Sequence, residues 1–219
     1  MTTTLVLFCR RPRPGVGKRR IAATLGPART LRLAEHLLAA ALEDASQWPG
    51  PVVIAPADAA DAAWAGQLLE RPCQVVAQRA GNLGERLNAL DQALRQAGQA
   101  RCIYIGSDAP ILDGDYYALA VKALETHDVV LGPADDGGVT LMGSRRPWPE
   151  LAGLPWSSDK LCRALELICV KQGLTINSLE RRYDIDHAKD LPRLFSDLEN
   201  DTRAARQKLR HWLAESGLL

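Results

Sequence analysis

The sequence predicts one α/β domain with a Rossmann-like, mainly parallel sheet flanked by helices. Short apolar runs of strand length alternate with longer segments that carry apolar residues at three- and four-residue spacing, which is the pattern of βαβ units. No long linker and no internal repeat divides the 219 residues, a length that suits one substantial core.

The first part of the chain alternates regularly between the two kinds of segment. Strands are expected at Thr4–Cys9, Pro51–Ala55, Gln74–Ala77, Cys102–Ile105 and Val129–Leu131. Helices are expected at Ala28–Ser46, Ala59–Glu70, Leu83–Gln96 and Tyr116–Thr126. Gly26 and Pro27 break the chain before the first of these helices, and Asp113 is a candidate cap for the fourth.

The second part of the chain is less regular. The segment "GGVTLMGS" predicts a further strand, Ser157–Lys171 a helix, and Thr175–Asp186 an extended segment. Two polar helices, Lys189–Leu198 and Thr202–Glu215, are expected to close the chain. We therefore expect a domain over residues 1–198, with a C-terminal helix in residues 199–219 packed on it.

Composition and charge exclude several classes of protein. Hydrophobic residues make up 47% and charged residues 24% of the chain, and the net charge is +1, so no global field favours nucleic acid or a membrane surface. No apolar run approaches the roughly 18 residues of a membrane span. Five cysteines are widely spaced without a CxxC pair, which predicts free, mostly buried thiols and a cytoplasmic protein.

The loop after the first predicted strand, "CRRPRPGVGK", combines glycines with cations. It is not a P-loop, because Pro12 and Arg19 stand where that motif needs glycine and a hydroxyl residue. In a parallel sheet, however, ligands bind beyond the carboxyl ends of the strands. We expect this loop to bind phosphate, although a solvated basic turn would have the same composition. The candidate residues are Arg11, Arg13, Gly15, Lys18 and Arg20.

Carboxylates follow other predicted strands at the same edge of the sheet. Asp108 in "YIGSDAP" is placed to bind a hard cation, Mg²⁺ or Mn²⁺, or to form a turn. In "GPADDGG", adjacent side chains point apart, so we expect Asp136 rather than Asp135 to face the site. In "YDIDHAKDL", Asp184 and Asp186 point to one side if the segment is extended, and Asp186 is also a candidate helix cap.

Two weaker candidates complete the site. The segment "GNLGERL" either faces a base or sugar through Gly84 and Arg86 or simply starts a helix. Trp156 either contacts a ligand or belongs to the core. The chain has no GxSxG, HExxH or CxxC motif, so serine hydrolase, zincin and thioredoxin-like chemistry are not supported.

Taken together, "LFCRRPRPGVGKRRIAATLGP", "GNLGERL", "YIGSDAPIL", "VVLGPADDGGVTLMG", "PWSS" and "YDIDHAKDL" resemble a bacterial family of GT-A-like transferases of the DUF2064 type. This family is described as glycosyltransferases associated with radical-SAM and selenium-related gene neighbourhoods. It is similar to the molybdenum-cofactor and phospholactate guanylyltransferases. The resemblance covers roughly residues 4–195 and implies a nucleotide-diphospho-sugar transferase fold.

The resemblance also implies roles for individual residues. Asp108 would be the metal carboxylate, Asp186 a second metal ligand, and Lys18 with the neighbouring arginines a phosphate site. Asp136 would bind or activate the acceptor, with Asp135, Gly137 and Trp156 near it. The expected partners are a nucleotide sugar or nucleoside triphosphate, a small-molecule acceptor, and Mg²⁺ or Mn²⁺, and a homodimer is compatible with the sequence.

These residues are compatible with three hypotheses about the activity. Glycosyl transfer is the expected reaction, nucleotidyl transfer is the alternative, and a nucleotide-binding protein without catalysis is the third. The third reading arises because the family commonly has a threonine where this chain has Arg19 and an aromatic residue where it has Val139.

Overall fold

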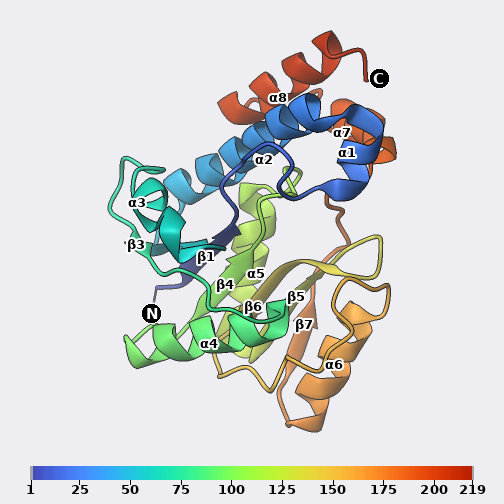
Figure 1. The fold of residues 1–219 in the computed structure, drawn as a ribbon. Coiled ribbons are helices and arrows are strands. Elements are labelled where there is room, and N and C mark those ends of the chain that lie inside the picture. Colours follow the sequence, from blue (N-terminus) through green and yellow to red (C-terminus); the bar gives the residue numbers. More distant parts are fainter. Residues whose placement is uncertain (1, 219) are drawn as a thin grey trace.

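A seven-stranded sheet forms the centre of the protein, in the order β3-β2-β1-β4-β6-β5-β7 (Figure 1). The structure is a computed structural model, and it describes residues 2–218; the predicted outer limits of the domain, at residues 1 and 219, lie outside this range. The strands are β1 (Thr4–Cys9), β2 (Val52–Pro56), β3 (Gln74–Val75), β4 (Cys102–Ile105), β5 (Val129–Pro133), β6 (Val139–Ser144) and β7 (Ile176–Ser178). Strand β6 pairs antiparallel with β4 and β5, whereas the other pairings are parallel. The predicted α/β fold with a mainly parallel sheet is confirmed.

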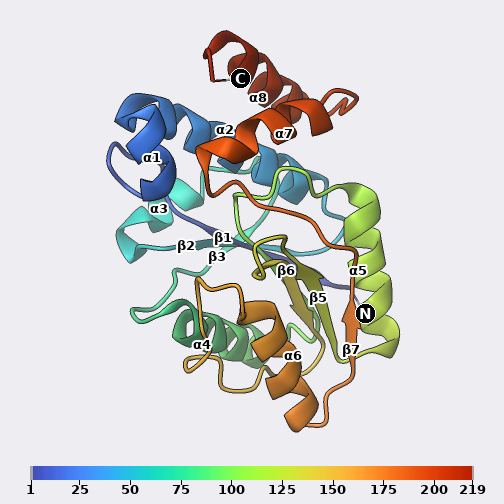
Figure 2. The same ribbon diagram turned by 90° about the vertical axis from the view of Figure 1, so that its right-hand side faces the viewer.

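Helices cover both faces of this sheet. They are α1 (Arg19–Leu25), α2 (Pro27–Gln47), α3 (Ala62–Ala65), α4 (Leu83–Gln96), α5 (Gly114–Thr126), α6 (Leu161–Lys171), α7 (Leu191–Asp197) and α8 (Ala204–Glu215), with 3₁₀ turns η1 (Ala59–Asp61) and η2 (Ala188–Asp190). In Figures 1 and 2, α4 and α6 lie below the sheet, and α1, α2, α7 and α8 form a group above it. No helix among residues 2–218 is long and apolar enough to cross a membrane.

The core has three parts, and α2 belongs to two of them. Leu38, Ala41 and Ala45 of α2 pack with α5 on one face of the sheet, and α4 and α6 pack on the other face. Leu33 and Leu37, on a neighbouring side of α2, pack against α1, α7 and α8. Because α2 is apolar on two sides, the C-terminal helices form an additional layer rather than lying on the sheet.

Local sequence signals set several boundaries as predicted. Helix α4 begins with a capping box in which the Asn82 side chain accepts from the Glu85 backbone N–H at 3.0 Å and the Glu85 side chain accepts from the Asn82 N–H. Asp113 caps α5 by accepting from the Tyr116 backbone N–H at 2.8 Å. The segment "GGVTLMGS" contains strand β6.

Four segments differ from the prediction. Helix α1 was not expected; it buries Ile21 and Leu25, and Gly26, at φ 78°, ends it directly before α2. The helix predicted at 59–70 is shortened to η1 and one turn of α3, which ends at Gly66. Helix α6 begins at Leu161 rather than at Ser157, because Ser157 has a left-handed backbone with φ 62°. In the extended segment at 175–186, only β7 pairs as a strand, apart from an isolated bridge between Ala134 and Arg182.

Candidate functional site

Three carboxylates come together at one edge of the sheet. Asp108 lies in the loop after β4, and Asp184 and Asp186 lie in the segment after β7. One oxygen from each lies within 4.8 Å of the other two. A hydrogen bond from the Ile185 backbone N–H to the Asp108 carbonyl, at 2.8 Å, ties the two segments together.

The ammonium group of Lys18 lies against this cluster. Its Nζ is 3.0 Å from Asp108 Oδ2 and 3.4 Å from Asp186 Oδ1, and it also donates to the Ile185 carbonyl. Lys18 precedes α1 with a left-handed backbone, at φ 43°, next to Gly17 at φ 75°. Such a conformation costs a non-glycine residue on the order of 1 kcal/mol, and residues in strained conformations cluster at functional sites. The loop therefore holds its lysine in a strained geometry that directs it into the carboxylates.

The electrostatics of the cluster follow from burial and from the excess of acids. Burial lowers the pKa of Lys18, but Asp108 and Asp186 outweigh burial and leave the pKa above its usual value. Burial raises the pKa of Asp108, but the Lys18 charge outweighs it and leaves the pKa below its usual value. Burial, followed by the charges of Asp108, Asp186 and Asp136, raises the pKa of Asp184 to about 7. One ammonium group thus does not balance the three carboxylates.

The donor set of this cluster fits a hard divalent cation. Mg²⁺ and Mn²⁺ prefer carboxylate oxygens, and the three side chains offer them from two separate segments at close range. The Lys18 ammonium group already acts as a stand-in cation at two of these carboxylates. Asp108, Asp184 and Asp186 are therefore the residues that could hold a metal.

Two cavities meet at the cluster and share Asp108, Asp186 and Arg20 as lining residues. The first has a volume of about 420 Å³ and a mixed lining of aromatic, apolar, hydroxyl and acidic side chains. It includes Phe8, Tyr104, Asp136, Met142, Trp156 and Asp184. The second has a volume of about 360 Å³ and is lined by the basic loop, including Arg10, Arg11, Lys18 and Arg19. The carboxylates Asp108 and Asp186 thus line both a cationic cavity and a cavity of mixed apolar and acidic character.

Seven predicted residues, namely Arg11, Lys18, Arg20, Asp108, Asp136, Trp156 and Asp186, come together around these two cavities. Asp136 Oδ1 accepts from the Gly138 backbone N–H at 2.8 Å, so the tight turn expected for "DDGG" and a carboxylate at the cavity occur together. The indole N–H of Trp156 donates to the Leu151 carbonyl at 2.9 Å, which fixes the ring at the cavity wall.

Other predicted residues are engaged elsewhere. Arg13 Nη2 lies 2.5 Å from Oδ1 of the buried Asp61, and the Arg11 guanidinium, at 3.6 Å from the same oxygen, also borders the basic cavity. Asp135 Oδ2 lies 2.6 Å from Arg193 Nη1 and does not line the first cavity. Arg86 donates to the carbonyl of Gly81, within the start of its own helix, and lines neither cavity. Long-range or local partners thus hold Arg13, Asp135 and Arg86 away from the two cavities, whereas Arg11 still lines the basic one.

The three predicted glycines act through the backbone. Gly15 has φ 74° in the basic loop, where it permits the turn. Gly84 packs so closely that a Cβ there would lie 2.2 Å from the Leu151 carbonyl oxygen. A Cβ at Gly137, which has φ 87°, would lie 2.0 Å from the Asp159 carbonyl oxygen. Gly84 and Gly137 therefore permit close packing against Leu151 and Asp159, and neither glycine lines the first cavity.

Sequence reasoning left Asp184 out of the predicted metal ligands, although it noted that Asp184 and Asp186 share one side of an extended segment. The two-residue alternation places Asp184 on the same side as Asp186, and its closeness to Asp108 in the structure makes it a third candidate ligand. Ser157, which lines the first cavity with a left-handed backbone, was also missed. No sequence pattern marks that conformation, because serine rarely adopts it.

A family model described as "Uncharacterized protein conserved in bacteria (DUF2064)" matches residues 37–158, which is more than half of the chain. The chain belongs to this family. The resemblance to the DUF2064 type drawn from the sequence is thus confirmed. No curated protein matches the chain.

Solved structures share the fold of this DUF2064 protein. A "putative nucleotide-diphospho-sugar transferase" from Desulfovibrio desulfuricans G20 matches with a TM-score of 0.88 and 23% identity, over 99% of this chain and 97% of that one. A cytidylyltransferase from Leptospira borgpetersenii matches with a TM-score of 0.58 and 13% identity, over 98% and 94%. Rv0371c from Mycobacterium tuberculosis matches with a TM-score of 0.52 and 18% identity, over 88% and 96%. At these identities the likeness establishes the nucleotide-diphospho-sugar transferase fold that the sequence resemblance implied.

Proposed function

We propose that this protein is a metal-dependent transferase that moves a glycosyl group from a nucleotide sugar to a small-molecule acceptor. One observation carries the proposal: a cluster of three carboxylates, with Lys18 against it, lies between a cationic cavity and a cavity lined by Asp136 and Trp156. A cationic cavity suits the phosphates of a donor, and the second cavity suits the sugar and acceptor.

Different residues of the chain would bind the donor phosphates and the metal ion in such a transfer. Arg10, Arg19 and Arg20 would bind the diphosphate and offset the charge that develops on it as the sugar leaves. Asp108, Asp184 and Asp186 would hold Mg²⁺ or Mn²⁺, which when bound supplies charge stabilisation for the leaving phosphates. Lys18, at the border between the carboxylates and the cationic cavity, is within reach of both groups.

Asp136 is the candidate general base. Its Oδ1 is engaged by the Gly138 N–H, and among residues 2–218 its Oδ2 has no hydrogen-bond partner, so Oδ2 would accept the proton of the acceptor hydroxyl. Trp156, held in place by its bond to Leu151, would form a wall for the sugar or acceptor.

Nucleotidyl transfer is the second candidate, and the density of cations supports it. Arg10, Arg11, Lys18, Arg19 and Arg20 all line the cavity of about 360 Å³, a charge that suits a triphosphate at least as well as a diphosphate. In that reaction pyrophosphate leaves from the cationic cavity and the nucleoside occupies the other.

The deciding experiment combines ligand-induced thermal shifts with product analysis. Nucleoside diphosphates, nucleoside triphosphates and nucleotide sugars are tested with and without Mg²⁺ or Mn²⁺ on the wild type, on Asp108→Asn and on Asp135→Asn. Asp135→Asn is the matched control, because Asp135 pairs with Arg193 outside the cavity. A ligand at about 100 times its dissociation constant stabilises by roughly 2.7 kcal/mol, so binding is readily detected.

Each outcome of this experiment favours one of the hypotheses about the activity. A metal-dependent shift that Asp108→Asn loses and Asp135→Asn keeps supports the site. Release of a nucleoside diphosphate then identifies glycosyl transfer, and release of pyrophosphate identifies nucleotidyl transfer. Binding without any turnover of the bound donor, when hydroxyl and phosphate acceptors are also supplied, supports a nucleotide-binding protein without catalysis. The absence of a shift with every nucleotide refutes the transferase proposal.

A further inference from the structure

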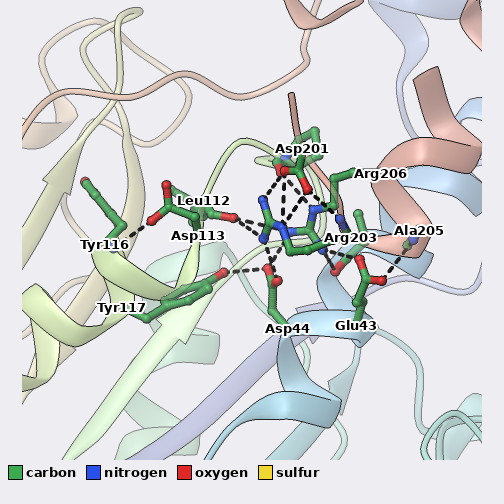
Figure 3. A network of polar contacts seen from close by, with 12 residues as sticks. Glu43, Asp44, Leu112, Asp113, Tyr116, Tyr117, Asp201, Arg203, Ala205 and Arg206 are labelled. Carbon is green, nitrogen blue, oxygen red and sulfur yellow. Dashed lines mark hydrogen bonds and ion pairs between the residues drawn. The ribbon is translucent and has the colours of Figure 1, made fainter. Parts of the chain in front are cut away.

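Two arginines tie the C-terminal helix α8 to the loop that carries Asp108. Arg206 Nε donates to the Pro110 carbonyl at 3.1 Å, and its Nη2 donates to the Leu112 carbonyl at 3.3 Å. Arg203 Nη1 donates to the same Leu112 carbonyl at 2.8 Å. Figure 3 shows the two guanidinium groups converging between Leu112 and the acidic side chains of α2. Contacts from a distant part of the sequence therefore hold the backbone two and four residues after Asp108.

Arg206 is held in one orientation by a complete set of partners. Its side chain is 0% exposed, and besides the two loop carbonyls it donates to the Ala40 carbonyl, to Glu43 Oε2 at 3.1 Å and to Asp44 Oδ2 at 2.6 Å. A guanidinium group has five N–H donors, and these five bonds use all of them. A buried charge with every donor paired forms a rigid anchor, because any rotation would leave a buried donor or acceptor unsatisfied.

The loop itself has few backbone hydrogen bonds to hold it. Between β4 and α5, within the described part of the chain, its one internal backbone hydrogen bond runs from the Leu112 N–H to the Ala109 carbonyl, at 3.2 Å. The Ile185 N–H holds the Asp108 carbonyl from the other side. Pro110 and Leu112 are buried, so their carbonyls need protein donors, and Arg203 and Arg206 supply them.

We propose that Arg206, assisted by Arg203, positions Asp108 at the carboxylate cluster and thereby sets the affinity of the site for a divalent cation. The inference about the cation rests on the proposed function; the anchoring of the loop does not. Some groups do not bind the metal themselves but orient the residues that do. Replacing such a group typically changes the affinity for the metal 10- to 100-fold. Arg206 is in this sense a positioning residue, since it contacts the loop and not the cluster.

The test compares Arg206→Lys and Arg203→Lys with Leu213→Ala. Lysine keeps the charge but lacks the planar fork that reaches two carbonyls and two carboxylates at once. Leu213→Ala is the matched control, because Leu213 is a buried residue of the same helix that packs in the cluster with α2 and α7. Arg203 is partly exposed, so its variant keeps the test valid if Arg206→Lys does not fold.

Two readouts are measured on the full chain, at a temperature where every variant is folded. Hydrogen–deuterium exchange of residues 107–112 reports on the loop, and Mn²⁺ titration followed by electron paramagnetic resonance reports on the cluster. We expect faster exchange of the loop in both arginine variants and a Mn²⁺ dissociation constant about tenfold higher in Arg206→Lys. Leu213→Ala should leave the exchange rate of the loop and the Mn²⁺ dissociation constant at their wild-type values.

Wild-type exchange of the loop in the arginine variants overturns the proposal, as does an equal increase in Leu213→Ala, which would indicate loss of stability alone. Faster loop exchange with unchanged Mn²⁺ affinity overturns the link between the loop and the cluster. Wild-type protein that binds no Mn²⁺ refutes the metal site of the proposed function, and loop exchange alone then decides whether Arg206 is the anchor.

Discussion

Replacing Lys18 with methionine removes the only ammonium group that contacts the carboxylate cluster among residues 2–218, and it should expose the competition between lysine and metal. Methionine keeps a stem of similar length and has the same Cβ, so the strained backbone at φ 43° is unchanged. The change therefore isolates the charge and its three hydrogen bonds.

The magnitude follows from the contacts of Lys18. A hydrogen bond to a charged group contributes about 1.5–3 kcal/mol. Solvent reduces this value here, because the Asp108 and Asp186 side chains are 38% and 37% exposed. We therefore expect Lys18→Met to lower the free energy of unfolding by about 2 kcal/mol without metal, which corresponds to a melting temperature lower by about 4–8 °C.

The free energy that Lys18 contributes to folding should also oppose the binding of a metal ion to the carboxylates. If Lys18 must leave its carboxylates before a cation binds, Lys18→Met should lower the Mn²⁺ dissociation constant by up to about thirtyfold. Saturating Mn²⁺ should then cancel the difference in melting temperature. Thermal unfolding over a Mn²⁺ titration measures both quantities.

Arg19→Met is the matched control, because Arg19 is the neighbouring cation and has no ion pair with any described residue. It should leave the melting temperature and the Mn²⁺ affinity unchanged. Equal Mn²⁺ affinity in wild type and Lys18→Met would refute the competition, as would a deficit in melting temperature that Mn²⁺ does not reduce.

Three further predictions concern single side chains. Asp184→Asn should raise the melting temperature of the metal-free protein, because it removes a carboxylate that burial and neighbouring acids destabilise, and it should abolish stabilisation by Mn²⁺; a retained Mn²⁺ response would contradict its role. Gly84→Ala should cost about 1–3 kcal/mol in urea unfolding, because its Cβ would lie 2.2 Å from the Leu151 carbonyl oxygen; unchanged stability would show that the neighbouring segment moves freely. Asp128→Asn should destabilise the protein at pH 7, because hydrogen bonds from Thr175 hold the pKa of Asp128 below its usual value of 3.8. This stabilisation is complete above pH 3.8 and lost as pH falls through the lowered pKa, so the deficit should shrink below pH 3.8; a deficit independent of pH would refute the reasoning.

Elements whose limits depend on neighbouring residues were predictable from the sequence. Helix α4 was predicted over its observed residues because its apolar residues recur at three- and four-residue spacing, and the structure adds a capping box of Asn82 and Glu85 at its start. Strands β1 and β4 were predicted because buried central strands are continuous apolar runs between polar loops. Helix α1 was missed because seven residues with a basic start carry too weak a periodic signal.

The edge of the sheet where the chemistry-bearing residues gather was also predictable, because parallel strands place their carboxyl ends together. This is why Lys18, Asp108 and Asp186, which are far apart in the sequence, could be expected at one site. Only the tertiary structure decided which of the other predicted side chains lie at this site. Arg13 forms an ion pair with Asp61, and Asp135 forms one with Arg193, so both side chains lie away from the two cavities. Each pair links residues that are distant in the sequence.

The amino-acid sequence by itself therefore determined the α/β class, the order of most elements and the acidic and basic residues available at the strand ends. These depend on periodicity, capping and the direction of strands, which are properties of adjacent residues. The tertiary structure alone decided that Lys18 lies against the carboxylates, that Asp184 completes the cluster and that Arg206 anchors the Asp108 loop. The contacts of Lys18 with Asp108 and of Arg206 with Pro110 join residues 90 and 96 positions apart, and local pattern carries no information about how such distant groups pair.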